Sequence, residues 1–300
     1  MISFTTLKCS ICKSKIKNKA TIEPDINPLK DLKIKKKNWS NLEKAVKKRI
    51  FFPYHRCRCG LLTNKYFLDH KSLKYLYSNM NENIHSNDDE TNDLRTKNEY
   101  LKQIKNIIKG KNDDFSILEI GADNGSFQKL IRSYNSKIKT SVVEPNKKMF
   151  KKLKSLSNNV YSDIKILPKN KKFDLIIAIH VLDHIPNFLD FLKVLKSKLK
   201  KKGLIYGVVH NERSMMARIL GNRWPAYCLQ HPQLFNKSSI DKAFKKLNYN
   251  KKFIKKTINF FNLGFLLHHL FIVIFNKRIN FPSFFPIGLK LGNFSFLYKK

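Results

Sequence analysis

The sequence predicts an α/β protein built on a parallel sheet with helices on both sides. From Phe115 to about Val209, short apolar runs alternate with stretches whose apolar residues have helical spacing. Four of these runs resemble strands buried on both faces: SILEI, TSVVE, FDLIIAI and LIYGVV. Between the last two runs, one helical face collects Phe188, Leu192, Leu195 and Leu199. Strands that alternate with helices are typical of a parallel sheet, because a helix usually returns the chain between parallel neighbours.

The composition fits a folded protein with a strongly basic surface. Apolar residues make up 42% of the 300 residues and aromatic residues 12%, which is enough for a sizeable core. The formal net charge is +38, but only nine of the 60 basic residues are arginine, the residue that binds phosphates bidentately. The lysines are also spread along the whole chain. We therefore favour a solvated basic exterior, with nucleic acid as an alternative but less favoured partner.

Neither a secretory leader nor a membrane-spanning segment is predicted. Met1–Lys8 lacks a continuous apolar core, and no stretch of about 18 uninterrupted apolar residues occurs. The closest approach is Phe260–Phe275, which is interrupted by Asn262, Gly264, His268 and His269. We expect a buried helix there; the alternative is a helix at a membrane interface, aided by flanking lysines. The expected compartment is the cytoplasm, with peripheral membrane contact as the alternative.

Composition divides the chain into four segments: 1–78, 79–110, 111–212 and 213–300. The first holds four of the five cysteines, and the third holds the predicted strands. The second begins as a polar, Asn-rich linker over 79–98 and continues as a helix through Glu99–Ile108. The last includes a helix expected to begin with a capping box at Ser238–Asp241, and it closes with an alternating strand at Phe294–Tyr298.

A glycine turn follows the first predicted strand. The strand ends at Ile120 and leads into Gly121 and Gly125, after which a helix is expected from Ser126 to Ser133. Glycine lets the backbone approach a ligand closely, since no Cβ is in the way. The second strand ends at Glu144, a carboxylate that can accept hydrogen bonds from both hydroxyls of a ribose. The pattern predicts a cofactor with a nucleoside part.

Two cofactor classes suit such a turn, and charge distinguishes them. A dinucleotide turn reads G-x-G-x-x-G, with its middle glycine against the pyrophosphate. Here the middle position is Asp123, whose charge would repel a pyrophosphate. S-adenosylmethionine carries a sulfonium and an ammonium group, so nearby Glu119 and Asp123 are compatible with it. The residues therefore favour S-adenosylmethionine.

The order of four motifs resembles the class I S-adenosylmethionine-dependent methyltransferases over roughly residues 100–210: ILEIGADNG, VVEP, FDLIIAIHVLDHIPNFLDFL and KKKGLIYGVV. The resemblance implies a Rossmann-like, seven-stranded sheet whose antiparallel final strand is supplied by 293–299. It also implies cofactor contacts at Glu119, Gly121, Ala122, Asp123 and Gly125 for the methionine part, Glu144 for the ribose, Asp163 for the adenine end, and His180 beside them. Asp123 departs from the family pattern, because many members have a second glycine there.

Candidate catalytic residues follow the strand FDLIIAI. His180, Asp183 and His184 lie at the carboxyl edge of the predicted sheet, where such folds bind ligands. A histidine of near-neutral pKa can take a proton from the acceptor while the methyl group moves. The alternative is that both histidines only cap the strand and the following helix.

A second candidate cluster lies at Arg223–Phe235. It resembles the acceptor-side segment of methyltransferases that carry an N-terminal zinc module, including those that act on deoxysugar carbons. That segment often reads Tyr-His-Glu-His, of which only the last histidine is present, as His231. His231 is therefore the best single candidate for the general base. Trp224 and Tyr227 could stack on an acceptor ring or fill the core.

Cysteines near the N-terminus suggest a zinc site. Cys9 and Cys12 form one pair, and Cys57 and Cys59 form a second with a one-residue spacer. Four thiolates suit tetrahedral zinc, His55 could replace one of them, and reduced free thiols are the alternative. The stretch YHRCRCGLLTNKYF resembles the YxxCxxCGLxF segment of zinc-module methyltransferases with one residue missing. The resemblance thus implies a zinc-ribbon-like module that helps cover the acceptor, with 213–300 as an acceptor-side extension.

These observations predict an enzyme that methylates a small-molecule or glycan acceptor: a sugar, nucleotide-sugar or glycan precursor, at oxygen or carbon. The first alternative is a methyltransferase acting on RNA of the ribosomal type, which the basic charge would suit. The second is a non-catalytic, zinc-dependent binding protein.

Overall fold

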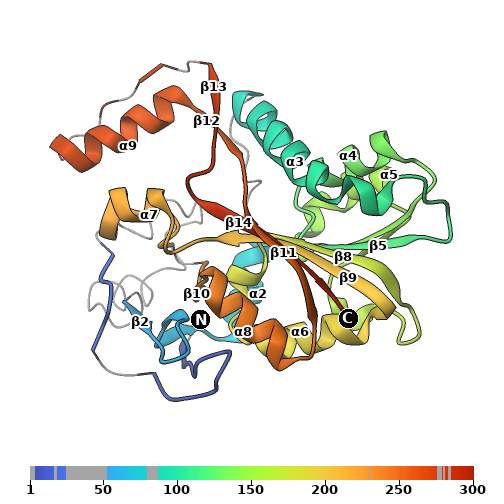
Figure 1. The fold of residues 1–300 in the computed structure, drawn as a ribbon, viewed down its shortest axis with the longest axis horizontal. Coiled ribbons are helices and arrows are strands. Elements are labelled where there is room, and N and C mark those ends of the chain that lie inside the picture. The colour runs from blue at the N-terminus through green and yellow to red at the C-terminus, as the bar shows by residue number, and fades with distance from the viewer. Residues whose placement is uncertain are drawn as a thin grey trace.

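A seven-stranded sheet forms the centre of the molecule (Figure 1). The computed structural model describes residues 4–16, 19–24, 53–79, 87–228, 230–275, 279, 281–282 and 285–300. The sheet order is β11-β14-β9-β8-β5-β6-β7. In chain order its strands are β5 (Ser116–Ile120), β6 (Lys139–Val143), β7 (Asn159–Tyr161), β8 (Phe173–Ile179), β9 (Leu199–His210), β11 (Asn250–Lys256) and β14 (Asn293–Lys299). The predicted α/β fold class is confirmed.

Strand direction follows the predicted pattern. The five strands from β7 to β9 are parallel, and β14 is antiparallel to both of its neighbours, β9 and β11. The predicted closing strand is therefore present. It lies between β9 and β11, and its side chains from Phe294 to Tyr298 are all buried. The chain leaves β5 in one direction toward β6 and returns on the other side at β8. A crevice for a ligand is expected at such a reversal of strand order.

Helices cover both faces of the sheet, because neighbouring residues on each strand point to opposite sides. On β8, Leu175 and Ile177 pack with α3 (Asn87–Ile108) and α4 (Ser126–Tyr134), whereas Ile176 packs with α6 (Phe188–Ser197) and α8 (Lys237–Lys246). The remaining helices are α2 (His70–Asn79), α5 (Phe150–Leu156), α7 (Met215–Leu220), α9 (Leu263–Phe275) and short 3-10 turns at Lys147–Met149, Ile164–Ile166, Leu182–His184 and Gly221–Arg223.

Two helix starts differ from the sequence-based expectations. Helix α3 begins at Asn87, within the stretch expected to be a linker, and an ion pair between Asp93 and Lys97 one turn apart supports its first half. The capping box of α8 is formed by Asn236 and Ser239, two residues before the expected one. The Asn236 side chain accepts from the Ser239 N–H, and the Ser239 hydroxyl accepts from the Asn236 N–H. An asparagine side chain thus takes the role expected of Ser238.

The N-terminal region is small and shares a sheet with a later part of the chain. Its strands are β1 (Phe4–Thr6), β2 (Tyr54–Arg56), β3 (Leu62–Asn64) and β4 (Tyr66–Leu68). Strand β1 pairs with β4, whereas β3 lies between β2 and β10 (Gln233–Leu234). The segment after β9 is therefore joined to the N-terminal region by main-chain hydrogen bonds.

An excursion between β11 and β14 extends from the sheet at the same side as α7 (Figure 1). It consists of β12 (Asn259–Asn262), α9 and β13 (Pro286–Leu289), and its two strands pair antiparallel. Strand β12 packs against α3. The Phe260–Phe275 segment was expected to be a buried helix; α9 is found there, but the side chains of Phe265 and Phe275 are 45% and 55% exposed. No helix in the described part of the chain has both the length and the apolar content needed to cross a bilayer.

The contact between β9 and β14 leaves room for glycine alone at position 207. A Cβ on Gly207 would come within 2.2 Å of the buried ring of its cross-strand partner, Phe296. We predict that Gly207→Ala lowers the free energy of unfolding by about 1–3 kcal/mol, the usual cost of overpacking, in urea denaturation. Gly292→Ala is the matched control, since a Cβ there meets nothing within 4 Å. Adding Phe296→Leu should recover part of the loss; an unchanged midpoint for Gly207→Ala would contradict this account.

Candidate active site

The turn after β5 is held in a left-handed conformation at three of its five positions. The φ angles are +68° at Gly121, +48° at Asp123 and +79° at Gly125. A Cβ at Gly121 would lie 2.6 Å from Val181, so only glycine fits there. Aspartate tolerates the left-handed region better than most side chains, and Asp123 therefore completes the turn without the family's second glycine. The predicted turn leads directly into α4.

Glu144 fixes this turn from the end of β6. One carboxylate oxygen accepts from the Asp123 N–H at 2.8 Å, and the other accepts from the Asn146 N–H at 2.8 Å. Burial raises the pKa of the Glu144 carboxyl, and these two hydrogen bonds oppose the rise. Asp163 follows β7, one strand further from β5, and its carboxylate caps a 3-10 turn by accepting from Lys165. The carboxylates predicted for ribose and adenine thus follow adjacent strands.

Glu119 is a buried carboxylate at the centre of the sheet. Its Oε2 accepts from Gln128 Nε2 at 2.6 Å, and only 2% of the residue is exposed. Burial raises the pKa, whereas the Gln128 hydrogen bond and the charge of Lys97 lower it; the outcome is a pKa of about 7. Around the turn, Glu119, Asp123 and Glu144 form a negative environment. Such a site fits a cationic ligand and disfavours a pyrophosphate.

Four histidines and one aspartate gather beside the turn. His180 and His184 follow β8, His210 ends β9, and His231 precedes β10. Ring centroids are 4.6 Å apart for His180 and His210, 4.8 Å for His210 and His231, and 4.5 Å for His184 and His231. Asp183 is fully buried among them. The structure therefore brings together the predicted catalytic residues of two segments that are far apart in the sequence.

Asp183 is bonded to His210. Its Oδ2 accepts from His210 Nδ1 at 2.8 Å and from the His210 backbone N–H at 3.1 Å. The first bond selects the tautomer that carries its proton on Nδ1, so the lone pair lies on Nε2. The His210 side chain is 25% exposed, whereas Asp183 is inaccessible. An oriented imidazole with a free lone pair is the arrangement required of a general base.

His231 and His184 are bonded to each other. His231 Nδ1 donates to the carbonyl of Ala226 at 2.7 Å, and its Nε2 lies 3.2 Å from His184 Nε2. The lone pair of His231 therefore accepts from His184. Tyr227 and Trp224 are buried in the apolar cluster behind this pair, and burial raises the pKa of Tyr227 to about 12. Both aromatic rings fill the core here.

Burial dominates the titration of all four imidazoles. It lowers the pKa of His180, His184, His210 and His231, and for His210 the neighbouring Asp183 partly opposes this effect. Each pKa lies below the ordinary histidine value of about 6.5. The cluster is therefore uncharged at neutral pH.

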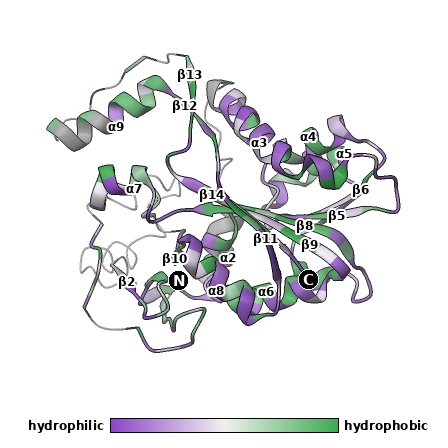
Figure 2. Cartoon of the chain, in the orientation of Figure 1, coloured by the Kyte–Doolittle hydropathy of each residue, from purple (hydrophilic) through white to green (hydrophobic). Residues whose placement is uncertain are grey.

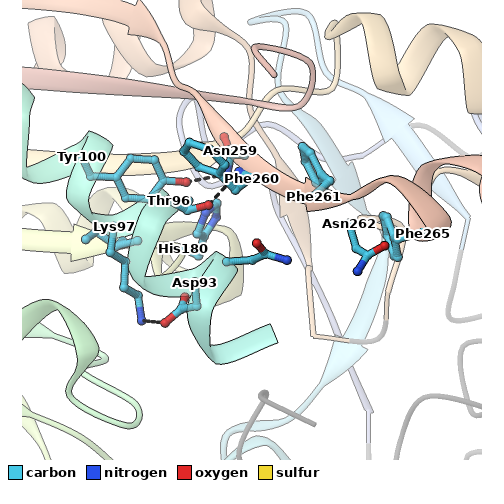
Figure 3. A pocket seen from close by; sticks show the side chains of 12 residues that line it. Asp93, Thr96, Lys97, Tyr100, His180, Asn259, Phe260, Phe261, Asn262 and Phe265 are labelled. Atoms are coloured by element: carbon cyan, nitrogen blue, oxygen red, sulfur yellow. Dashed lines mark hydrogen bonds and ion pairs between the residues drawn. The ribbon is translucent and has the colours of Figure 1, made fainter. Parts of the chain in front are cut away.

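A pocket of about 300 Å³ opens next to His180 (Figure 3). Its walls come from α3, the end of β8 and the excursion: Asn92, Asp93, Thr96, Lys97, Tyr100, Ile179, His180, Asn259, Phe260, Phe261, Asn262 and Phe265. Hydrogen bonds from Asn259 to the Tyr100 hydroxyl and from the Phe260 N–H to Thr96 hold β12 against α3. His180 has a φ of +51°, and its buried Nδ1 has no partner in the described structure. That nitrogen is enclosed by the protein, so a ligand would bond to it only after the surrounding side chains move.

Sequence reasoning missed His210 and the pocket walls. His210 ends a predicted strand, so the rule that singled out His180 could have found it. The walls on β12 depend on a pairing with β13 that no local pattern indicates.

The four predicted metal-ligating cysteines converge. Cys9 Sγ lies 3.4 Å from Cys59 Sγ, Cys12 Sγ lies 3.2 Å from Cys57 Sγ, and all four sulfurs are within 4.8 Å of one another. Sulfurs bound to one zinc at about 2.3 Å are about 3.8 Å apart, so this set fits a tetrahedral ion. His55 lies outside the group, and its Nδ1 bonds to the Lys19 carbonyl. The one-residue spacer between Cys57 and Cys59 is compatible with convergence.

The fold and the strand-end site define a class I methyltransferase architecture. The family described as Methyltransferase domain matches residues 81–252, more than half of the chain, and the chain belongs to this family. An uncharacterized protein of Methanocaldococcus jannaschii is 31% identical over 110 residues, which cover 36% of this chain. The chain spans about half (47%) of the length of that curated relative.

Similar solved structures are also methyltransferases. The plantazolicin methyltransferase BpumL in complex with SAH is 15% identical, with a TM-score of 0.49, over 77% of this chain and 91% of that one. A SAM-dependent methyltransferase from Archaeoglobus fulgidus is 20% identical, with a TM-score of 0.45, over 70% of this chain and 94% of that one.

We predict that the purified chain holds one zinc ion per molecule at the four cysteines, measured by elemental analysis. Cys57→Ser should release the metal and lower the thermal midpoint, because Cys9 and the neighbouring Leu61 lie in the main core. Cys228→Ser is the control, since Cys228 is outside the group. A metal-free protein with four reactive thiols in this region would contradict the prediction.

Proposed function

We propose that the chain transfers a methyl group from S-adenosylmethionine to an acceptor at the histidine cluster. The observation that carries this proposal is the arrangement of an anionic turn and an oriented, uncharged base at one edge of the sheet. Glu119 and Asp123 would hold the cationic methionine part, Glu144 the ribose and Asp163 the adenine end. When bound, the cofactor supplies an electrophilic methyl group on a sulfonium sulfur.

His210 is our candidate for the general base, in place of His231. Its Nε2 is free to take the proton of an acceptor hydroxyl or carbon acid, whereas the lone pair of His231 accepts from His184. Asp183 orients the ring and stabilises the imidazolium that forms as the proton arrives. His180 lines the pocket and would lie beside the acceptor.

For the acceptor we propose a sugar, nucleotide-sugar or glycan precursor. The resemblance of Arg223–Phe235 and of the cysteine region to zinc-module methyltransferases supports this class. The position of the N-terminal region supports this class further. Its strand β3 pairs with β10, which begins two residues after His231, so the region lies beside the proposed acceptor site. A pocket of about 300 Å³ also has the size of a small polar ring and its substituents.

The direct test is incubation of the chain with a methyl-labelled donor and panels of nucleotide-sugars, lipid-linked glycans and RNA. Mass spectrometry should find labelled sugar product together with S-adenosylhomocysteine. Label in RNA alone would replace the sugar proposal by the RNA alternative. Failure to bind S-adenosylmethionine at high micromolar concentration would overturn the whole proposal.

Cofactor affinity should fall as the solution becomes acidic. A cation binds the ionised form of Glu119, and the pKa of this carboxyl is about 7 in the free protein. The affinity is therefore full above this pKa and is lost as pH falls through it, with about eightfold weaker binding at pH 6.0 than at pH 7.5. Calorimetry with S-adenosylmethionine at both pH values measures the ratio. Glu119→Gln should bind more weakly with little pH dependence; an unchanged pH dependence in this variant would assign the effect elsewhere.

Replacing the base should reduce turnover without affecting cofactor binding. We predict that His210→Asn and Asp183→Asn each lower kcat by about 10²- to 10⁴-fold, because the proton acceptor or its orientation is lost. Cofactor Kd should stay within about twofold, which shows that the fold is intact. His231→Asn is the discriminating variant and should have a smaller effect. If His231→Asn abolished turnover while His210→Asn retained it, His231 would be the base.

A further inference from the structure

Exposed apolar side chains concentrate around α7 and the excursion. Among the described residues, six large apolar side chains here are 40% to 68% exposed: Met215, Ile219, Phe265, Phe275, Ile279 and Phe285. We call this set the apolar face. Helix α7 contacts α9, and both lie on one side of the molecule (Figures 1 and 2). Only two other large apolar side chains of the described chain, Ile166 and Val194, are comparably exposed, and they lie on other elements.

The two segments that carry the apolar face are basic. Residues 213–223 and 257–292 contain six lysines and arginines and no acid. The nearby acidic side chain is Asp93, on the α3 wall of the pocket, where it pairs with Lys97. Arg218 is an exposed residue on α7 between Met215 and Ile219, and the side chain of Arg213, which pairs with the buried Glu212, is 57% exposed. An apolar face within a strongly cationic segment is complementary to an anionic lipid surface, which accepts apolar groups below its charged headgroups.

The pocket and the apolar face share a wall. Phe265 lines the pocket with Phe260 and Phe261, and it is itself 45% exposed as part of the apolar face. An acceptor with a lipid anchor could therefore leave its anchor in the bilayer while its polar part reaches His180. This part of the argument rests on the proposed methyl transfer; the docking itself does not.

We propose that the apolar face docks on the surface of an anionic bilayer and presents the pocket to a membrane-borne acceptor. The side chains favour a bilayer over RNA, because insertion below the headgroups would bury all six, whereas stacking on bases would use only the three phenylalanines and leave Met215, Ile219 and Ile279 exposed. They favour a bilayer over a second copy of the chain, because a copy would bring the same positive charge to the interface.

The test is flotation of the full chain with vesicles of phosphatidylcholine alone and with 30% phosphatidylglycerol (roughly the anionic content of a charged leaflet). Wild type should bind the anionic vesicles, with binding that weakens as salt is raised. The variant carrying Met215→Ser, Ile219→Ser and Phe285→Ser should bind them at least about tenfold more weakly. The control carrying Ile166→Ser and Val194→Ser removes apolar side chains of similar exposure elsewhere and should bind as wild type does.

Each other outcome overturns the docking proposal. The first is that the wild-type protein does not bind anionic vesicles. The second is that the variant and the control lose vesicle binding equally. The third is that the variant binds vesicles as wild type does but loses RNA binding or dimerisation. Calorimetry with S-adenosylmethionine on the same samples separates the two proposals. Vesicle binding without cofactor binding would support docking and count against methyl transfer, whereas the reverse result would leave methyl transfer standing and remove docking.

Discussion

The parallel register of β5, β8 and β9 is the constraint on which the site depends. Because these strands run in one direction, their carboxyl ends meet at one edge of the sheet. The glycine turn, His180 and His210 each follow or end one of the three strands. A shift of one residue would turn Ile176 and Leu175 to the wrong faces and break both cores, so the packing also fixes the site's geometry.

The burial of the Asp183 carboxylate opposes the stability of the fold. This carboxylate has no exposed surface, and no lysine or arginine in the described chain pairs with it. Burying such a charge costs several kcal/mol, of which two charge-assisted hydrogen bonds from His210 return about 1.5–3 kcal/mol each. Its other oxygen has no hydrogen bond. Buried charges of this kind concentrate at functional sites, and the proposed proton transfer at His210 would account for this one.

The sequence alone predicted the features that depend on residues close together in the chain. Four of the five parallel strands were found because their apolar runs are continuous, and the turn because Gly121 and Gly125 are conformationally necessary. The fifth, β7, is three residues long and only half-buried, so it gives no such run. The cysteine pairs were found because short spacing brings thiols together. What escaped prediction depends on contacts between distant segments. The bond between His210 and Asp183 requires the register of β8 with β9, and the orientation of His231 requires the Ala226 carbonyl and His184.

The sheet shared by β2, β3 and β10 has a consequence for the order in which the chain folds. Thr63 pairs with Gln233, which follows it by 170 residues (233 − 63). At about 5–20 residues per second, roughly 10–30 s of synthesis separate the two halves of this sheet. During that time one edge of β3 has no strand to pair with, and the thiols of Cys57 and Cys59 adjoin an incomplete structure. The N-terminal region is therefore synthesised before β10 but completes its sheet only afterwards. If its cysteines bound a metal ion early, the nascent chain would have a local structure before β3 could pair with the distant β10.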